Sequence, residues 1–163
     1  MTIDPKLDLC LTRVVDVPTE LVWAAWTQPQ HLTKWFCPKP WYVADCTLDV
    51  RPGGAFRTLM RGPDGGEHDN VGCYLEVVPM RRLVWTDALE AGFRPNRTKQ
   101  FLPFRFTGTV LFEPQPGGAT KYTAIAMHSD EASARKHDEI GFSKGWALAL
   151  DQLVDAIKSG GIR

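Results

Sequence analysis

The most regular pattern of apolar and polar positions lies in the last third of the chain. At about 100° per residue, large and small apolar residues share one face of a helix: Phe142, Gly145, Trp146, Ala149, Leu150, Leu153, Ala156 and Ile157. Charged residues fall on the opposite face: Lys144, Asp151, Asp155 and Lys158. The pattern predicts one long amphipathic helix, from Ser129 to Ser159, whose apolar face packs against another part of the protein.

Alternating apolar and polar residues dominate the middle of the chain. Strands bounded by Gly and Pro turns are predicted over 7–17, 41–50, 54–61, 70–78, 82–87, 104–113 and 119–128. Two short helices follow the first strand: one has its apolar residues at 21–26, and the second covers about 29–35. Because links this short join antiparallel neighbours, we expect an α+β fold. A curved antiparallel sheet of six to seven strands wraps around the C-terminal helix, in a single domain spanning 1–163.

Small residues on the helix and on the strands predict a cavity between them. The even positions of 104–112 are apolar or lack a side chain, which turns that face of the strand inward. Gly108, Ala124 and Ala126 then oppose Gly145 and Ala149. Since native cores are filled to high density, small residues on both walls indicate either room for a guest or a close approach of two backbones.

Aromatic residues supply the candidate lining of this cavity. The predicted ligand-binding residues are Trp35, Phe56, Tyr74, Trp85, Phe93, Phe106, Tyr122, His128, Phe142 and Trp146. Such side chains bind ring systems or acyl chains by burying apolar area. The alternative is that they pack only against one another as core. The long connection over 88–103 also carries Phe93 and Phe101 in a polar setting, and loops of this length are often lids.

Three polar residues are candidates for acid–base chemistry or for anchoring a ligand: His128, Glu76 and Arg57. The sequence pattern does not fix the facing of Arg57 and Glu76. If they point inward, each needs a partner, because an unpaired charge in a cavity is costly. His137 falls about 140° from Phe142 on an ideal continuous helix, so we expect a structural or surface position. No histidine, cysteine or glycine motif indicates a metal or cofactor site.

The charge balance narrows the classes of partner. Lys plus Arg equals Asp plus Glu at 19 each, with a pI of about 6.9. This balance argues against nucleic acid or an anionic membrane as the main partner, since both usually meet a clustered basic surface. No signal-like N-terminus or run of 18 apolar residues is present, so we expect a cytoplasmic protein without membrane association. The four cysteines are widely spaced and are interpreted as free thiols.

Several segments resemble a known superfamily across nearly the whole chain. They are PTELVWAAWT at 18–27, LTKWF at 32–36, RPGGAFR at 51–57, GCYLEVVP at 72–79, RLVWT at 82–86, and GFSKGW at 141–146 with His137 before it. The chain is similar to the START-like, helix-grip (SRPBCC) superfamily, and more narrowly to its branch homologous to the activator of heat-shock-protein ATPase. The resemblance implies a sheet that grips the C-terminal helix, often around a hydrophobic cavity. Relatives include lipid carriers, cyclases, aromatases and a co-chaperone domain, so the fold does not fix the function.

The leading hypothesis from the sequence is a binding protein for a small apolar or aromatic molecule. It requires only the cavity. The alternatives are a co-chaperone-like protein-interaction module, and an enzyme of cyclase, aromatase or hydrolase type without a metal or nucleotide cofactor. A homodimer and a chaperone partner are left open, as are the ligand and the biological pathway.

Overall fold

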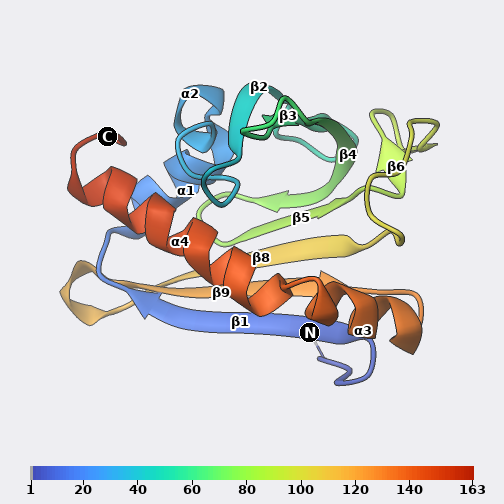
Figure 1. The fold of residues 1–163 in the computed structure, drawn as a ribbon. Helices are drawn as coiled ribbons and strands as arrows, with labels where there is room; N and C mark the ends of the chain where they lie inside the picture. Colours follow the sequence, from blue (N-terminus) through green and yellow to red (C-terminus); the bar gives the residue numbers. More distant parts are fainter. Residues whose placement is uncertain (1) are drawn as a thin grey trace.

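A computed structural model describes residues 2–163 and places seven strands in one antiparallel sheet (Figure 1). The order across the sheet is β1-β9-β8-β5-β4-β3-β2. The strands are β1 (Asp8–Val15), β2 (Tyr42–Leu48), β3 (Ala55–Arg61), β4 (Glu67–Val78), β5 (Arg82–Thr86), β8 (Thr107–Pro114) and β9 (Thr120–Met127). This confirms the predicted α+β fold, in which the first strand, β1, lies at one edge of the sheet and pairs with the last strand, β9.

The predicted strands are all present, but several boundaries differ. β4 begins at Glu67 instead of at residue 70, because 67–69 continue to pair with β3 across the turn that contains Gly65. β8 begins at Thr107 instead of at residue 104. The connection over 88–103 contains a small separate hairpin of β6 (Leu89–Glu90) and β7 (Arg94–Pro95). One 3₁₀ turn, η1 (Pro116–Gly118), joins β8 to β9.

Two short helices, α1 (Thr19–Thr27) and α2 (Pro29–Leu32), follow β1 as expected. Towards the C-terminus, the prediction of a single helix over 129–159 is wrong. Asp130 caps α3 (Glu131–Glu139) by accepting a hydrogen bond from the backbone N–H of Ser133 at 2.8 Å. The helix then ends and α4 (Phe142–Lys158) begins after Gly141, whose φ of 105° is left-handed.

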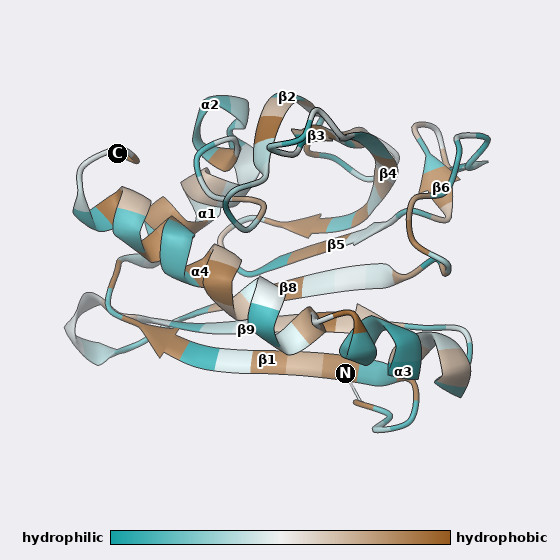
Figure 2. Cartoon of the chain, viewed as in Figure 1, coloured by the Kyte–Doolittle hydropathy of each residue, from teal (hydrophilic) through white to brown (hydrophobic). Residues whose placement is uncertain are grey.

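The longer helix, α4, lies against the sheet along its predicted apolar face (Figure 1). Its buried residues are Phe142, Ala149, Leu150, Leu153 and Ile157, whereas the four charged residues opposite are exposed. By contrast, α3 is mostly hydrophilic (Figure 2). Because α3 has little apolar surface to bury, other contacts must hold it in place.

His137 makes the polar contact that docks α3. Of the two positions expected for His137, the surface one is wrong and the structural one is confirmed, because the side chain is only 5% exposed and bonds to His128. The break at Gly141 means that the phase of one continuous helix does not apply to this residue. Nδ1 of His137 lies 2.9 Å from Nε2 of His128, and Nδ1 of His128 lies 2.8 Å from the carbonyl oxygen of Leu7. Burial, reinforced by the neighbouring His128, lowers the pKa of His137 to about 4.

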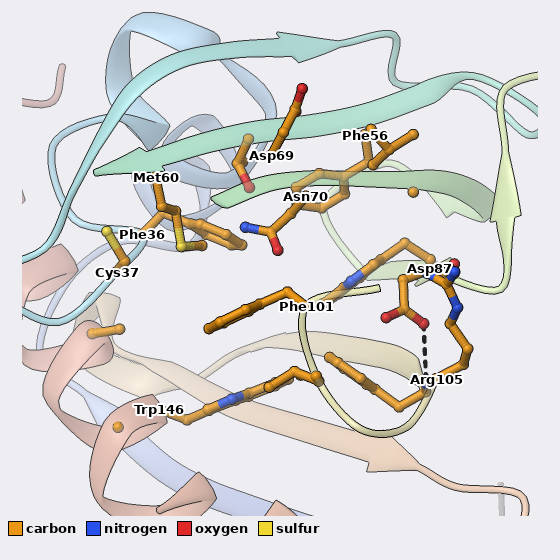
Figure 3. Close-up of a pocket in the computed structure, with 18 of the residues that line it drawn as sticks. Phe36, Cys37, Phe56, Met60, Asp69, Asn70, Asp87, Phe101, Arg105 and Trp146 are labelled. Atoms are coloured by element: carbon orange, nitrogen blue, oxygen red, sulfur yellow. Dashed lines mark hydrogen bonds between the residues drawn. The ribbon is translucent and has the colours of Figure 1, made fainter. Parts of the chain in front are cut away.

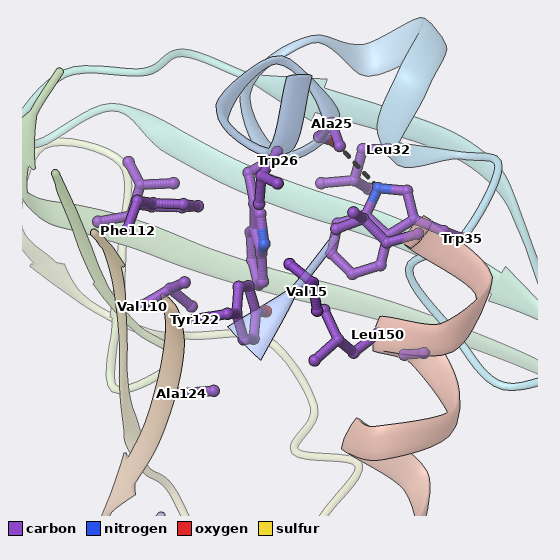
Figure 4. Close-up of a cluster of buried hydrophobic side chains, with 14 of the residues drawn as sticks. Val15, Ala25, Trp26, Leu32, Trp35, Val110, Phe112, Tyr122, Ala124 and Leu150 are labelled. Atoms are coloured by element: carbon purple, nitrogen blue, oxygen red, sulfur yellow. Dashed lines mark hydrogen bonds between the residues drawn. The ribbon is translucent and has the colours of Figure 1, made fainter. Parts of the chain in front are cut away.

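The core is built around tryptophans at the end of the sheet covered by α1 (Figure 4). The indole N–H of Trp35 donates to the carbonyl of Ala25 at 3.0 Å. The ring of Trp85 lies 5.2 Å from that of Trp26. A Cβ on Gly108 would lie 2.4 Å from the Trp85 ring. Gly108 therefore provides the space for this indole, so the expectation that it leaves room for a guest is wrong.

We predict that Gly108→Ala destabilises the protein by about 1–3 kcal/mol, because the added methyl displaces a packed indole. Gly145→Ala is the matched control. Its Cβ would meet only Pro38 Cγ, at 3.9 Å, and removing a helical glycine should stabilise by up to about 1 kcal/mol. Urea unfolding of both variants measures the effects. Equal stabilities would contradict the role assigned to Gly108.

We also predict that the protein loses up to about 3 kcal/mol of stability through His137 as the pH falls from about 6.5 to about 4. The unfolded chain takes up the proton near 6.5 whereas the folded chain resists it down to about 4, so stability falls with pH across that interval. His137→Asn should remove this part of the dependence. Urea midpoints at pH 7, 5.5 and 4 test it, and parallel pH profiles for parent and variant would refute it.

Candidate functional site

A cavity of about 300 Å³ lies between the sheet, α4 and the loop over 96–106 (Figure 3). Nine of its 25 lining residues are aromatic. The aromatic lining residues are Trp26, Trp35, Phe36, Phe56, Trp85, Phe101, Phe106, Tyr122 and Trp146. Walls of this kind accept a ring or an apolar chain by burial of area.

Six of the ten predicted ligand-binding residues line this cavity: Trp35, Phe56, Trp85, Phe106, Tyr122 and Trp146. The other four do not. Tyr74 is fully buried in the core, and Phe93 is 52% exposed beside Gly53. Phe142 and His128 are buried against His137, which itself lines the cavity.

Arg57 and Glu76, the two charged candidates whose facing was open, lie outside the cavity lining. Arg57 sits between Phe56 and Thr58, which face the cavity, so its own side chain projects from the opposite face of β3. There its Nε lies 2.8 Å from Asp69 Oδ1. Glu76 pairs with Arg82 at 3.4 Å on a half-exposed surface. The Glu76–Arg82 pair therefore belongs to the outside of the sheet, whereas Asp69, the partner of Arg57, also contributes to the cavity lining.

A polar set that the sequence analysis did not single out lies on the cavity wall instead. Asn70 pairs in register with Thr58, and its amide points into the cavity in Figure 3. Asp87 and Arg105 lie at the loop side, and His137 at the α3 side. Strand parity could have identified Asn70, since it shares a face with Gly72 and Tyr74. Nothing periodic marks the others.

Burial raises the pKa of Asp87 above its usual range. The backbone N–H of Phe106, 2.9 Å from its carboxylate, and the nearby Arg105 partly offset that effect. The guanidinium of Arg105 donates to the carbonyl oxygens of Asp87 at 3.0 Å and Thr98 at 3.3 Å. Arg105 is thus held in place by backbone groups, which leaves its positive charge available at the cavity edge.

The loop over 96–106 forms one wall and is tied to the sheet at both ends. Asn96 donates to the carbonyl oxygens of Val71 and Asp87, each at 2.8 Å. Further on, Phe101 stacks on His68 with ring centroids 3.4 Å apart, and His68 in turn stacks on Trp41. The ring of Phe101 remains 55% exposed at the rim. The lid role predicted for this connection stays a prediction.

The wall opposite the sheet comes from α4 and from the segment after α2. Gly145 and Ala149 line the cavity, and the space beside Gly145 is open up to Pro38. Gln152 fastens the segment to α4, because its amide N–H₂ donates to the carbonyls of Trp35 at 3.0 Å and Cys37 at 2.9 Å. Burial raises the pKa of Cys37 to about 11, so its thiol is protonated at neutral pH.

Over residues 2–163 no group of three or more His, Cys, Asp or Glu side chains could hold a metal ion. None of the helices in that range has both the length and the apolar character needed to cross a bilayer.

Comparison with known proteins places the chain in a family. The crystal structure of protein NE0264 from Nitrosomonas europaea is 43% identical, with a TM-score of 0.90 over 98% of this chain and 99% of that one. A solution structure from Arthrobacter aurescens is 23% identical, with a TM-score of 0.81 over 97% and 90%. The AHSA1 protein SPO3351 from Silicibacter pomeroyi is 21% identical, with a TM-score of 0.67 over 94% and 99%.

The last two likenesses support the fold alone. No match was found among proteins with curated descriptions. Residues 16–158 match the family model described as activator of Hsp90 ATPase homolog 1-like protein. The chain therefore belongs to the activator of Hsp90 ATPase homolog 1-like family.

Proposed function

We propose that this protein binds a small aromatic or apolar molecule in the cavity between the sheet and α4. The observation that carries the proposal is the open space beside Gly145, enclosed by aromatic rings on the facing walls. In a core without a guest, side chains would be expected to fill such a space to native density. A volume of about 300 Å³ is at the small end of ligand pockets, which favours a ligand of one or two rings.

The state of Trp146 supports the same reading. It lines the cavity, is only partly buried, and stacks against Trp85 with centroids 6.5 Å apart and planes 15° from parallel. A partly exposed indole on the inner face of a core helix has apolar area that a ligand can cover. Phe106, 6.1 Å from Trp146, extends this aromatic surface towards the loop.

Each of the two alternative functions would need a structural feature beyond the cavity. An enzyme would need an acid or base at the cavity; the predicted candidates His128, Glu76 and Arg57 are absent from its lining, whereas Asp87 and His137 lie on it. A co-chaperone-like role, suggested by the family description, would need an apolar docking surface. Within residues 2–163 the exposed large apolar side chains are Ile3, Val14, Tyr42, Phe93, Phe101, Ile140 and Leu148. Of these, Phe93 and Phe101 are packed against Gly53 and His68 respectively. We favour small-molecule binding because it requires only the cavity.

We predict that Gly145→Leu abolishes uptake of an apolar fluorescent probe while the protein stays folded. The isobutyl group extends into the open space beside Pro38, with an overpacking cost of at most about 1–3 kcal/mol. Lys144→Leu, one residue earlier on the exposed face of α4, is the matched control and should leave probe binding unchanged. Fluorescence titration and thermal melts, run side by side, decide the matter. Undiminished binding by a folded Gly145→Leu protein would refute the proposal.

Native mass spectrometry of freshly purified protein extends this experiment to the natural ligand. A co-purifying small molecule should be present in the parent and in Lys144→Leu, and absent from Gly145→Leu. A molecule retained by all three proteins would bind outside the cavity and would contradict the proposal.

A further inference from the structure

The paired histidines have a fixed arrangement of protons. The carbonyl oxygen of Leu7 can only accept, so Nδ1 of His128, 2.8 Å away, carries a hydrogen. In a neutral imidazole the other nitrogen is then an acceptor. Nε2 of His128 therefore accepts from Nδ1 of His137, 2.9 Å away. It follows that Nδ1 of His137 bears the hydrogen and that its Nε2 has a free lone pair.

The surroundings keep His137 neutral at physiological pH. His128 and His137 are 7% and 5% exposed. Aromatic rings surround His137, with centroids 4.8 Å away for Phe104, 5.0 Å for Phe106 and 5.3 Å for Phe142. Within residues 2–163 neither histidine forms an ion pair with a carboxylate. Burial opposes protonation, in keeping with the lowered pKa of His137.

The free nitrogen belongs to a residue of the cavity wall. His137 lines the cavity, whereas His128 does not. Nδ1 of His137 is already engaged, and no donor within the described part of the chain bonds its Nε2. Nε2 is therefore the polar atom that His137 can offer to a bound molecule. Since the neighbouring wall is aromatic, a hydrogen-bond donor on the bound molecule is the group best suited to satisfy Nε2.

We propose that the cavity selects an aromatic or apolar molecule carrying a hydroxyl or N–H group, and that Nε2 of His137 accepts a hydrogen bond from that group. This inference rests on the proposed binding function and narrows its ligand class. His128 is a positioning residue: held by the Leu7 carbonyl, it fixes the tautomer of His137 without touching the ligand. The selectivity is chemical, since a hydrocarbon of the same shape fills the cavity but leaves Nε2 unsatisfied.

The test compares 2-naphthol with 2-methylnaphthalene, which carries a methyl group where 2-naphthol carries a hydroxyl. Both are titrated at pH 7 against a bound apolar fluorescent probe. The parent protein should prefer the naphthol by about five- to tenfold, as one net hydrogen bond implies. In His137→Asn the side-chain amide nitrogen is bonded to Cγ, as Nδ1 is, and can still donate to His128. Because nothing replaces Nε2, the preference should fall to about one.

Two further variants separate the role of the atom from damage to the fold. In His137→Gln the side-chain amide oxygen and nitrogen are bonded to Cδ, as Nε2 of histidine is. This variant should therefore keep part of the preference for 2-naphthol. His31→Asn makes the same change at a buried histidine outside the cavity lining and should keep all of it. A full preference in folded His137→Asn would overturn the assignment to Nε2.

A measurement on the parent protein needs no variant. Histidine ¹⁵N NMR should show both rings protonated on Nδ1, with a bare Nε2 on His137 whose shift moves on addition of 2-naphthol and not of 2-methylnaphthalene. A proton on Nε2 of His137 at pH 7 would overturn the inference. Equal affinity of the parent for both probes would overturn the inference alone, whereas failure to bind either probe would overturn the proposed function as well.

Discussion

The packing of Trp85 over Gly108 is the contact on which the other parts of this structure depend. This indole reaches α1 through Trp26, β3 through Phe56 and α4 through Trp146, so one side chain joins three elements to β5. Only a residue without Cβ at position 108 of β8 leaves room for it. The same indole lines the cavity. The Trp85 indole is thus part of both the core and the candidate binding surface, so a change in its packing alters the cavity wall as well.

The histidine pair acts in the same way at the N-terminal end of α4, where His137 contacts Phe142. It ties the mostly hydrophilic α3 to His128, the residue after β9, and it also brings a polar atom to the cavity wall. A buried polar contact specifies geometry more narrowly than apolar packing does, because its atoms must meet within hydrogen-bond distance.

Periodicity explains which parts of the structure could be predicted from the sequence. The buried face of α4 and the antiparallel neighbours in the sheet follow from repeats of 3.6 and 2 residues, and both were predicted. The break between α3 and α4 was missed because the apolar repeat begins only at Phe142, so no repeat runs through Gly141 to mark a change of phase. The left-handed φ of Gly141 is known only from the structure. The facing of Arg57 was open because its pairing with Asp69 depends on the register of β3 against β4. The polar residues of the loop over 96–106 follow no repeat, and their positions depend on tertiary hydrogen bonds.

The attachment made by Gln152 has a consequence for how this cavity can change over evolution. Its amide group bonds only to backbone atoms, the carbonyls of Trp35 and Cys37 and the N–H of Lys39. The segment that closes this end of the cavity is therefore secured to α4 whatever side chains it carries. Phe36, Cys37 and Pro38 can be exchanged without releasing the wall they belong to. Relatives that keep a glutamine at this position can vary the size and polarity of the cavity end while retaining the same frame.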